Sequence, residues 1–345
     1  MSSSPVQAIT TVDYHTAGEP FRIVLDGVPE IPGSTVGERR VFAQESEEID
    51  RLRRLLCHEP RGHADMYGGF LTPANDDGAD FGVLFWHKDG FSTACGHGTI
   101  ALGVWAVETG RVASDPDGET IVTIDVPSGR VEARVLQTAG RITSVTFRNV
   151  ESWAIATAVP VETSRGTFHV DLSYSGAIYA SLNAADAGLE VTPRHYTDII
   201  AIGREIKWKL NDHVLAQHPT DPRLSGVYGT IVYDDFDDTE AGPHQRNATV
   251  FADGEVDRSP CGSGTGARVA LLAASGRLKP GQVFTHDSIV DTRFLARVFD
   301  APAGTTSPDG HPMVVPEVQG MAYQTGEHRF TLNTFDDVGT GFVLR

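Results

Sequence analysis

The stretches Cys95-Gly-His-Gly-Thr-Ile-Ala and Cys261-Gly-Ser-Gly-Thr-Gly-Ala are nearly alike, although their cysteines lie 166 residues apart. Over the eighteen positions that begin at each cysteine, seven residues are identical in place. Because the offset is close to half of the 345-residue chain, the sequence predicts one folding unit that occurs twice. Each copy joins a thiol to a glycine-rich turn that opens a helix. We therefore expect a site at the seam between two similar halves, with a sulfur on either side of one small substrate.

The segments after the two cysteines predict buried helices. Residues 100–107 are apolar on every side, and residues 269–274 are nearly so. A helix that is apolar all round is buried all round. Amphipathic helices are predicted upstream, at 44–56 and 197–211. We expect each half to wrap its strands around a central helix whose N-terminus points toward the other half.

Runs of β-branched residues bounded by turn residues predict many strands and few helices in each half. The expected strands are 82–87, 120–126, 131–136, 143–148, 168–172, 177–182, 227–233 and 248–252. Strand and helix do not alternate regularly, which favours the α+β class over a doubly wound parallel sheet. The first domain is predicted at 1–155 together with about 326–345 and the second at 156–325, with the site at their interface.

Composition narrows the classes of function. A net charge of −18 and a pI near 5.0 oppose nucleic-acid binding, which depends on cationic contacts to phosphate. The sequence lacks an apolar run long enough to cross a membrane, and its first residues lack the basic and apolar regions of a signal peptide. Three cysteines are too few for a disulfide framework, and Cys57 is interpreted as a small apolar filler near a helix end. We expect a cytoplasmic protein.

The duplicated motif predicts acid–base chemistry. A thiol at a helix N-terminus faces unpaired N–H groups and the positive end of the helix dipole, which favour the thiolate. The neighbouring glycines let the backbone approach a ligand closely, and the same N–H groups can bind a carboxylate. Two such motifs suit removal of the α-proton from one face of an amino acid and its return to the other.

Other interpretations of the motif are weaker. The four lysines (88, 207, 209 and 279) lie in no recognisable pyridoxal phosphate loop, so we expect a cofactor-free two-base mechanism. The glycine-rich turn lacks the Lys-Ser/Thr of a phosphate loop, and the Cys-x-x-Cys of a redox pair is absent. Cys57, His58 and His63 do not have the spacing of a zinc site, and no metal is expected.

Four motifs together resemble the proline racemase family, which includes hydroxyproline 2-epimerases and trans-3-hydroxy-L-proline dehydratases. They are Asp13-Tyr-His15-Thr-Ala-Gly-Glu19-Pro-Phe-Arg22, Met66-Tyr67-Gly68, Cys95-Gly-His97-Gly-Thr and Asp257-Arg-Ser-Pro-Cys261-Gly-Ser-Gly-Thr. They occur in the family's order and span residues 13 to about 290. The resemblance implies a diaminopimelate-epimerase-like fold, with two pseudo-symmetric domains that each roll a sheet around a central helix. It also implies that the enzyme needs no cofactor.

By this resemblance, Cys95 and Cys261 are the acid–base thiols, and each serves one face of the α-carbon. The same likeness implies substrate contacts from Gly96, His97, Gly262 and Ser263, with Asp257 and His97 beside the ring nitrogen. Two plainer roles stay open, namely a turn cap for Asp257 and a structural hydrogen bond for His97. His15 and Glu19 are expected to brace the site.

The family's dehydratases typically have threonine where this chain has Cys261, so two cysteines favour inversion at the α-carbon. The flanks Gly90–Ala94 and Ile100–Gly103 nevertheless look more like the dehydratase branch, and Ser263 departs from the threonine common among epimerases. The leading hypothesis is a 4-hydroxyproline 2-epimerase or proline racemase that acts on a small imino acid as a monomer or homodimer. The alternatives are a trans-3-hydroxy-L-proline dehydratase and a non-catalytic carboxylate-binding protein of the same fold.

Overall fold

The computed structural model describes residues 8–302, 305–307, 310–333 and 335–344, and within them eighteen strands form one continuous sheet. The α-helices are α1 (Val36–Glu45), α2 (Glu47–Cys57), α3 (Gly96–Glu108), α4 (Tyr196–Leu210) and α5 (Gly262–Ala274). The strands up to the middle of the chain are β1 (Ala8–Thr16), β2 (Glu19–Asp26), β3 (Tyr67–Thr72), β4 (Phe81–His87), β5 (Gly90–Phe91), β6 (Glu119–Val126), β7 (Gly129–Thr138), β8 (Arg141–Arg148) and β9 (Trp153–Thr163). The later strands are β10 (Gly166–Tyr174), β11 (Ile178–Asn183), β12 (Val227–Asp235), β13 (His244–Phe251), β14 (Glu255–Val256), β15 (Phe284–Ser288), β16 (Arg293–Asp300), β17 (Val314–Gly320) and β18 (Ala322–Thr331). All eight expected strands are present.

The sheet repeats one pairing pattern. From β1 to β8 the pairs run β1–β2 antiparallel, β2–β3 parallel, β3–β4 antiparallel, β4–β6 parallel, then β6–β7 and β7–β8 antiparallel. From β10 to β17 the pairs β10–β11, β11–β12, β12–β13, β13–β15, β15–β16 and β16–β17 repeat these directions in the same order. The predicted α+β class with two pseudo-symmetric halves is therefore confirmed.

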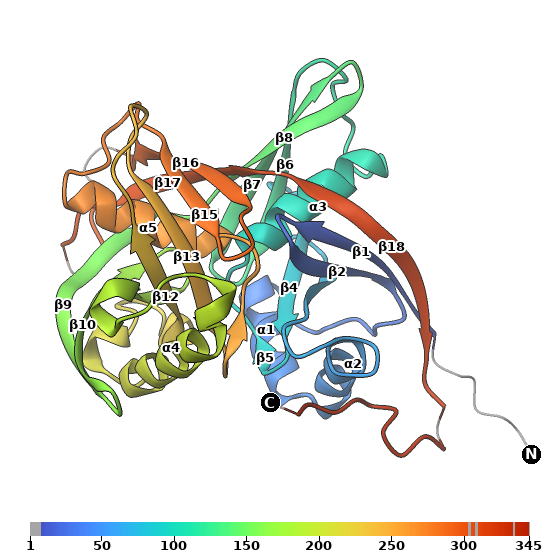
Figure 1. Cartoon of the computed structure of the whole chain (residues 1–345). Helices are drawn as coiled ribbons and strands as arrows, with labels where there is room; N and C mark the ends of the chain where they lie inside the picture. Colours follow the sequence, from blue (N-terminus) through green and yellow to red (C-terminus); the bar gives the residue numbers. More distant parts are fainter. Residues whose placement is uncertain (1–7, 303–304, 308–309, 334, 345) are drawn as a thin grey trace, which may run out of the picture.

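Three pairings complete and join the halves. β8 pairs with β17 antiparallel and makes the sheet continuous across the molecule. β9 adds to the free edge of β10, and β18 crosses over to add to the free edge of β1. Figure 1 shows the halves side by side, with β18 running along the outer edge of the first. The division at residues 155 and 325 stays a prediction.

Each half surrounds one buried helix. α3 lies against β1, β2, β6, β7, β8 and β18, while α5 lies against β9, β10, β11, β16 and β17. Every residue from Gly96 to Val107 is buried, as is every residue from Gly262 to Leu272, as expected for helices without a polar face. This packing fixes both helix N-termini at the middle of the molecule (Figure 1).

The outer helices cover the sheet in corresponding places. α4 follows β11, packs on β12 and β13, and agrees with the expected helix at 197–211. The expected helix at 44–56 is instead two helices that meet at Ser46, whose hydroxyl accepts a hydrogen bond from the Ile49 N–H and caps α2. Cys57 ends α2 fully buried, as expected. Among the described residues, no helix is both long and apolar enough to span a membrane.

Candidate active site

Cys95 is the N-cap of α3. Its backbone is extended (φ −157°), and its sulfur accepts a hydrogen bond from the Gly98 N–H at 3.2 Å. A Cβ at Gly98 would lie 2.7 Å from that sulfur, so a glycine is needed three residues after the cysteine. The glycine-rich turn thus holds the thiol over the first turn of the helix, where N–H groups lack intrahelical partners.

Cys261 caps α5 in the corresponding way, but with a different backbone. Its sulfur accepts from the Gly264 N–H at 3.3 Å, and a Cβ at Gly264 would lie 3.0 Å away. The φ of Cys261 is +63°, a region that residues with a side chain rarely adopt. Such strain costs on the order of 1–3 kcal/mol and is typical of functional positions. The second motif is therefore the more strained of the two.

The two helix N-termini touch each other. A Cβ at Gly96 would lie 2.6 Å from the Gly262 Cα, and a Cβ at Gly262 would lie 2.6 Å from the Gly96 Cα. Only glycine at both positions allows this approach. The structure therefore brings the cysteine motifs of the two halves together at one place.

Burial decides the protonation of both thiols. Cys95 is 4% exposed and Cys261 is 5% exposed. The loss of hydration raises the pKa of each thiol well above its usual value, although the N–H of Gly98 or Gly264 acts in the opposite direction. The N–H groups at the helix starts thus act in the direction that the sequence predicts, and desolvation is the larger effect.

His97 lies beside Cys95 and is neutral. Its Nε2 is 3.5 Å from the Cys95 sulfur, and its backbone carbonyl accepts a hydrogen bond from the Thr16 hydroxyl. Burial lowers the pKa of His97 to about 3. The ring is thus placed to share a hydrogen bond with the thiol rather than to act as a fixed cation.

Asp257 lies on the other side of His97. Its Oδ2 is 3.7 Å from the His97 Nδ1, while its Oδ1 accepts hydrogen bonds from the backbone N–H and the hydroxyl of Ser259. The Ser259 hydroxyl oxygen in turn accepts from the Cys261 N–H. Asp257 therefore caps the turn before Cys261 and also reaches the site. Burial raises the pKa of Asp257 to about 6.

Ser263 forms a hydrogen bond with Tyr179, whose hydroxyl lies near the Cys261 thiol. The hydroxyls of Ser263 and Tyr179 are 2.8 Å apart, and the Tyr179 hydroxyl is 4.0 Å from the Cys261 sulfur. Tyr67 plays the corresponding part in the first half, because its ring packs edge-on against His97 at 4.9 Å. The Tyr67 and Tyr228 hydroxyls are 3.0 Å apart and join the halves.

Of these three tyrosines, only Tyr67 had a sequence signal, as part of the motif Met66-Tyr67-Gly68. Tyr179 and Tyr228 lie in strands that the sequence predicted, at 177–182 and 227–233. An aromatic residue in a buried strand is ordinary, and only the pairing of β11 with β12 shows that both reach the site.

Of the two residues expected to brace the site, Glu19 lies where the halves meet. Glu19 is fully buried and accepts a hydrogen bond from the Arg258 N–H at 2.7 Å. The Arg258 side chain pairs with Asp65 at 2.7 Å. Burial, and then the neighbouring Asp257, raise the pKa of Glu19 well above its usual value. His15 accepts a hydrogen bond from the Gly18 N–H and is not buried.

The side chains of the site do not form a metal centre. Within the part of the chain that the structure describes, no three His, Cys, Asp or Glu residues gather so as to hold a metal ion. The arrangement instead offers two thiols, two helix N-termini that can bind a carboxylate, and neutral hydrogen-bonding side chains.

Comparisons with known proteins agree with this site. The profile of the proline racemase family matches residues 11–343. The chain is 42% identical to a trans-3-hydroxy-L-proline dehydratase of Bacillus cereus (97% of this chain, 98% of the relative) and 42% identical to a 3-hydroxyproline 2-epimerase of Burkholderia multivorans (98% and 99%). A hydroxyproline epimerase of Agrobacterium vitis, solved with bound trans-4-hydroxy-L-proline, superposes with a TM-score of 0.86 at 30% identity over 98% of this chain and 96% of that one. The chain therefore belongs to the proline racemase family.

Proposed function

We infer that this protein acts on trans-3-hydroxy-L-proline and dehydrates it. The observation that carries the proposal is the near-complete coverage of relatives named for 3-hydroxyproline, one a dehydratase and one a 2-epimerase. Among the relatives that are 41–42% identical to this chain, more are named trans-3-hydroxy-L-proline dehydratase than 3-hydroxyproline 2-epimerase, which supports the dehydratase hypothesis better than a 4-hydroxyproline 2-epimerase. The dehydratase-like flanks of Cys95 agree with this choice.

The stereochemistry of the substrate suits a single thiol. In trans-3-hydroxy-L-proline the hydroxyl is trans to the carboxylate, so it lies on the same ring face as the α-proton. A thiolate on that face removes the α-proton and returns it to the departing hydroxyl. The Cα–H and C3–O bonds break, a C2–C3 double bond forms and water leaves. The cyclic enamine then tautomerises to the ring imine.

We assign the base on that face to Cys95. The dehydratases that the sequence resembles typically have threonine in place of Cys261, which leaves the first cysteine as the base. The thiol must lose its proton before it can act. The cationic ring nitrogen of the bound substrate places a positive charge near the thiol, and such a charge lowers the pKa of a neighbouring thiol. The proton passes to solvent before the halves close on the substrate, because burial lowers the pKa of His97 to about 3 and makes it too weak a base to hold that proton.

The N–H groups at the two helix N-termini bind the carboxylate of the substrate in this proposal. As the α-proton leaves, negative charge grows on the carboxylate oxygens, and N–H groups at a helix start stabilise it. Gly96 and Gly262 let both helices approach the same point. Asp257 and His97, side by side at 3.7 Å, suit the ring nitrogen.

A second candidate function rests on Cys261. A thiol on the opposite face can deliver a proton to the same α-carbanion, and the product is then cis-3-hydroxy-D-proline. Both reactions begin with loss of the α-proton and differ only in the fate of the carbanion. We therefore expect some epimerisation at C2 beside the dehydration.

The proposal is tested by product analysis with three substrates in separate reactions. Trans-3-hydroxy-L-proline should give a ring imine that borohydride reduces to proline, whereas trans-4-hydroxy-L-proline and L-proline should be recovered unchanged. Inversion of trans-4-hydroxy-L-proline or L-proline, without imine from the 3-hydroxy compound, would contradict the proposal. Such a result would restore the 4-hydroxyproline epimerase or proline racemase hypothesis.

A further inference from the structure

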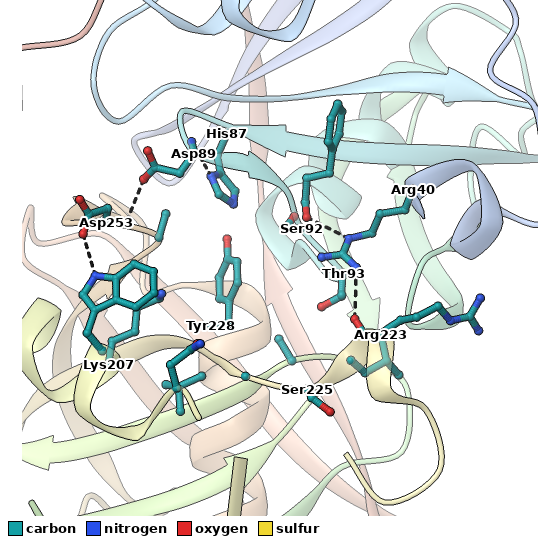
Figure 2. A pocket seen from close by; sticks show the side chains of 18 residues that line it. Arg40, His87, Asp89, Ser92, Thr93, Lys207, Arg223, Ser225, Tyr228 and Asp253 are labelled. Atoms are coloured by element: carbon teal, nitrogen blue, oxygen red, sulfur yellow. Dashed lines mark hydrogen bonds between the residues drawn. The ribbon is translucent and has the colours of Figure 1, made fainter. Parts of the chain in front are cut away.

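A pocket of about 220 Å³ lies between the halves, outside the closed thiol site. Its walls come from α1 and the β4–β5 turn of the first half and from α4, β12 and the loop before β12 in the second. Figure 2 shows these side chains facing one another across the space. Its volume is below the roughly 300–1,000 Å³ of sites for drug-sized ligands, so it suits a small metabolite.

Lys207 is the most unusual residue of this pocket. It is only 6% exposed, yet its ammonium makes no hydrogen bond or ion pair with any residue that the structure describes. Its nearest partner is the indole face of Trp208, at 3.6 Å from the nitrogen. Burial lowers the pKa of Lys207 to about 8. The charges of Asp253 and Asp89 partly offset this desolvation, but no described carboxylate forms an ion pair with the ammonium, and an anion in the pocket would supply that direct contact.

Arg40 faces Lys207 from the other side of the pocket (Figure 2). Its guanidinium donates to the backbone carbonyls of Phe91 and Arg223, at 2.9 and 3.1 Å. Both acceptors are uncharged, and no described carboxylate forms an ion pair with Arg40. Two cations from opposite halves therefore border one small space.

The two carboxylates of the pocket already have partners. Asp89 accepts from the Lys88 ammonium at 2.9 Å and from the Asp253 N–H at 2.8 Å. Asp253 accepts from the guanidinium of Arg204 and from the Trp208 indole N–H. Because these acids are neutralised, the unpaired charge at the pocket is positive. The chain as a whole, with a net charge of −18, has an overall field that does not attract anions.

Tyrosine side chains connect the pocket to the surroundings of both thiols. Tyr228 lines the pocket, and its hydroxyl is 3.0 Å from that of Tyr67, whose ring contacts His97. Tyr179 packs edge-on against Tyr228 at 5.6 Å and reaches Ser263 with its hydroxyl. Tyr228 therefore lies next to tyrosines that contact the surroundings of both thiols.

We propose that this pocket is an outer binding site, where Arg40 and Lys207 hold the carboxylate of an imino acid before its ring passes Tyr228 to the thiols. The proposal rests on the proposed function for the identity of the ligand, and its chemical class is a small ring amine that carries a carboxylate. Binding at this site would concentrate the substrate at the entrance to the thiols. It needs only the two local cations and not a positively charged protein surface.

The first test measures acetylation of the four lysines by limiting acetic anhydride, followed by peptide mass spectrometry. L-proline and pyrrole-2-carboxylate should slow acetylation of Lys207, whereas pyrrolidine, which lacks the carboxylate, should not. Lys209 and Lys279 are internal references. The same protection is expected in enzyme alkylated beforehand at Cys95 and Cys261, where the inner site is blocked. Absence of protection, equal protection by pyrrolidine or protection lost on alkylation would overturn the proposal.

The second test compares KM with kcat, which separates binding at the outer site from catalysis at the thiols. Lys207→Met should raise KM about tenfold, the effect of one lost charge-assisted hydrogen bond, with kcat close to that of the wild type. Lys207→Arg should restore KM because it keeps the charge. Lys209→Met, on the same helix but exposed, is the matched control and should change neither constant. An unchanged KM in Lys207→Met would overturn the proposal.

The two tests also separate this proposal from the proposed function. If no imino acid is turned over, acetylation still reports whether the pocket binds carboxylates. If 3-hydroxyproline is turned over but Lys207 is not protected, the outer site is wrong and the proposed function stands.

Discussion

Of the three buried cysteines in this chain, Cys95 and Cys261 have similar surroundings, and Cys57 differs from both. The Cys57 sulfur donates a hydrogen bond to the Met66 carbonyl inside the first half, whereas Cys95 and Cys261 each cap a helix at the seam. The sequence could predict this contrast because only two of the cysteines carry the glycine-rich turn. It could not predict the raised pKa values, since burial of the thiols depends on how closely the halves pack.

Cys95→Ser should abolish both proposed reactions, because a serine hydroxyl is far too weakly acidic to act as the base. General acid–base groups contribute about 10²–10⁴-fold, and we expect a fall in kcat of that order. Cys57→Ser is the control and should keep the wild-type rate, since Cys57 lies outside the site. The measurement is the initial rate of imine formation. Full activity in Cys95→Ser would refute its role.

Asp257 should make the stability of the protein depend on pH. Burial raises its pKa from an ordinary value near 4 to about 6. An acid with a raised folded pKa stabilises the fold only while protonated, so its contribution is lost as the pH rises through that range. The free energy of unfolding of the wild type should therefore fall relative to that of Asp257→Asn between about pH 4 and 6. Urea unfolding at several pH values measures this, and a difference independent of pH would contradict it.

The helices and strands were predictable to different degrees. The apolar runs at 100–107 and 269–274 predicted the two central helices, because a segment without a polar face must be buried. The break between α1 and α2 was missed, since a serine cap is a local signal that the apolar repeat at 44–56 conceals. Strands β1 and β2 were also missed, although the first of the family motifs lies in them.

Gly262→Ala should separate the two central helices. Its Cβ would lie 2.6 Å from the Gly96 Cα, and neither backbone can move without shifting a buried helix. We expect a loss of about 1–3 kcal/mol in the free energy of unfolding, typical of overpacking, together with a large loss of turnover. The control is Gly37→Ala in α1, whose Cβ would have only ordinary contacts, the nearest at 3.4 Å. Equal stability and activity for both variants would show that the contact between helices is unimportant.

At the scale of the whole molecule, contacts between the halves keep the thiols from solvent. Asp65 of the first half accepts hydrogen bonds from the Val256 N–H and the Arg258 side chain of the second. The repeated motif predicted that two halves meet at the site. The closed state could not be predicted, because the contacts that close the site come from residues outside the repeated motif.

Asp65→Asn should favour opening of the halves. Hydrogen bonds to charged groups contribute about 1.5–3 kcal/mol, which corresponds to roughly a 10- to 100-fold increase in the open population. Buried thiols react only when the protein opens, so alkylation of Cys95 and Cys261 by iodoacetamide should accelerate by that factor. Cys57, buried inside one half, is the internal reference and should react at an unchanged rate. Equal acceleration at all three cysteines would indicate general unfolding instead.

In the proposed mechanism, two thiols serve opposite faces of one α-carbon. Proton NMR in D₂O with trans-3-hydroxy-L-proline, in the wild type and in Cys261→Thr, distinguishes the roles of the two thiols. Both proteins should dehydrate the substrate, and only the wild type should form cis-3-hydroxy-D-proline with deuterium at C2. Formation of that epimer by Cys261→Thr, or recovery of trans-3-hydroxy-L-proline with its α-proton intact from the wild type, would contradict this mechanism.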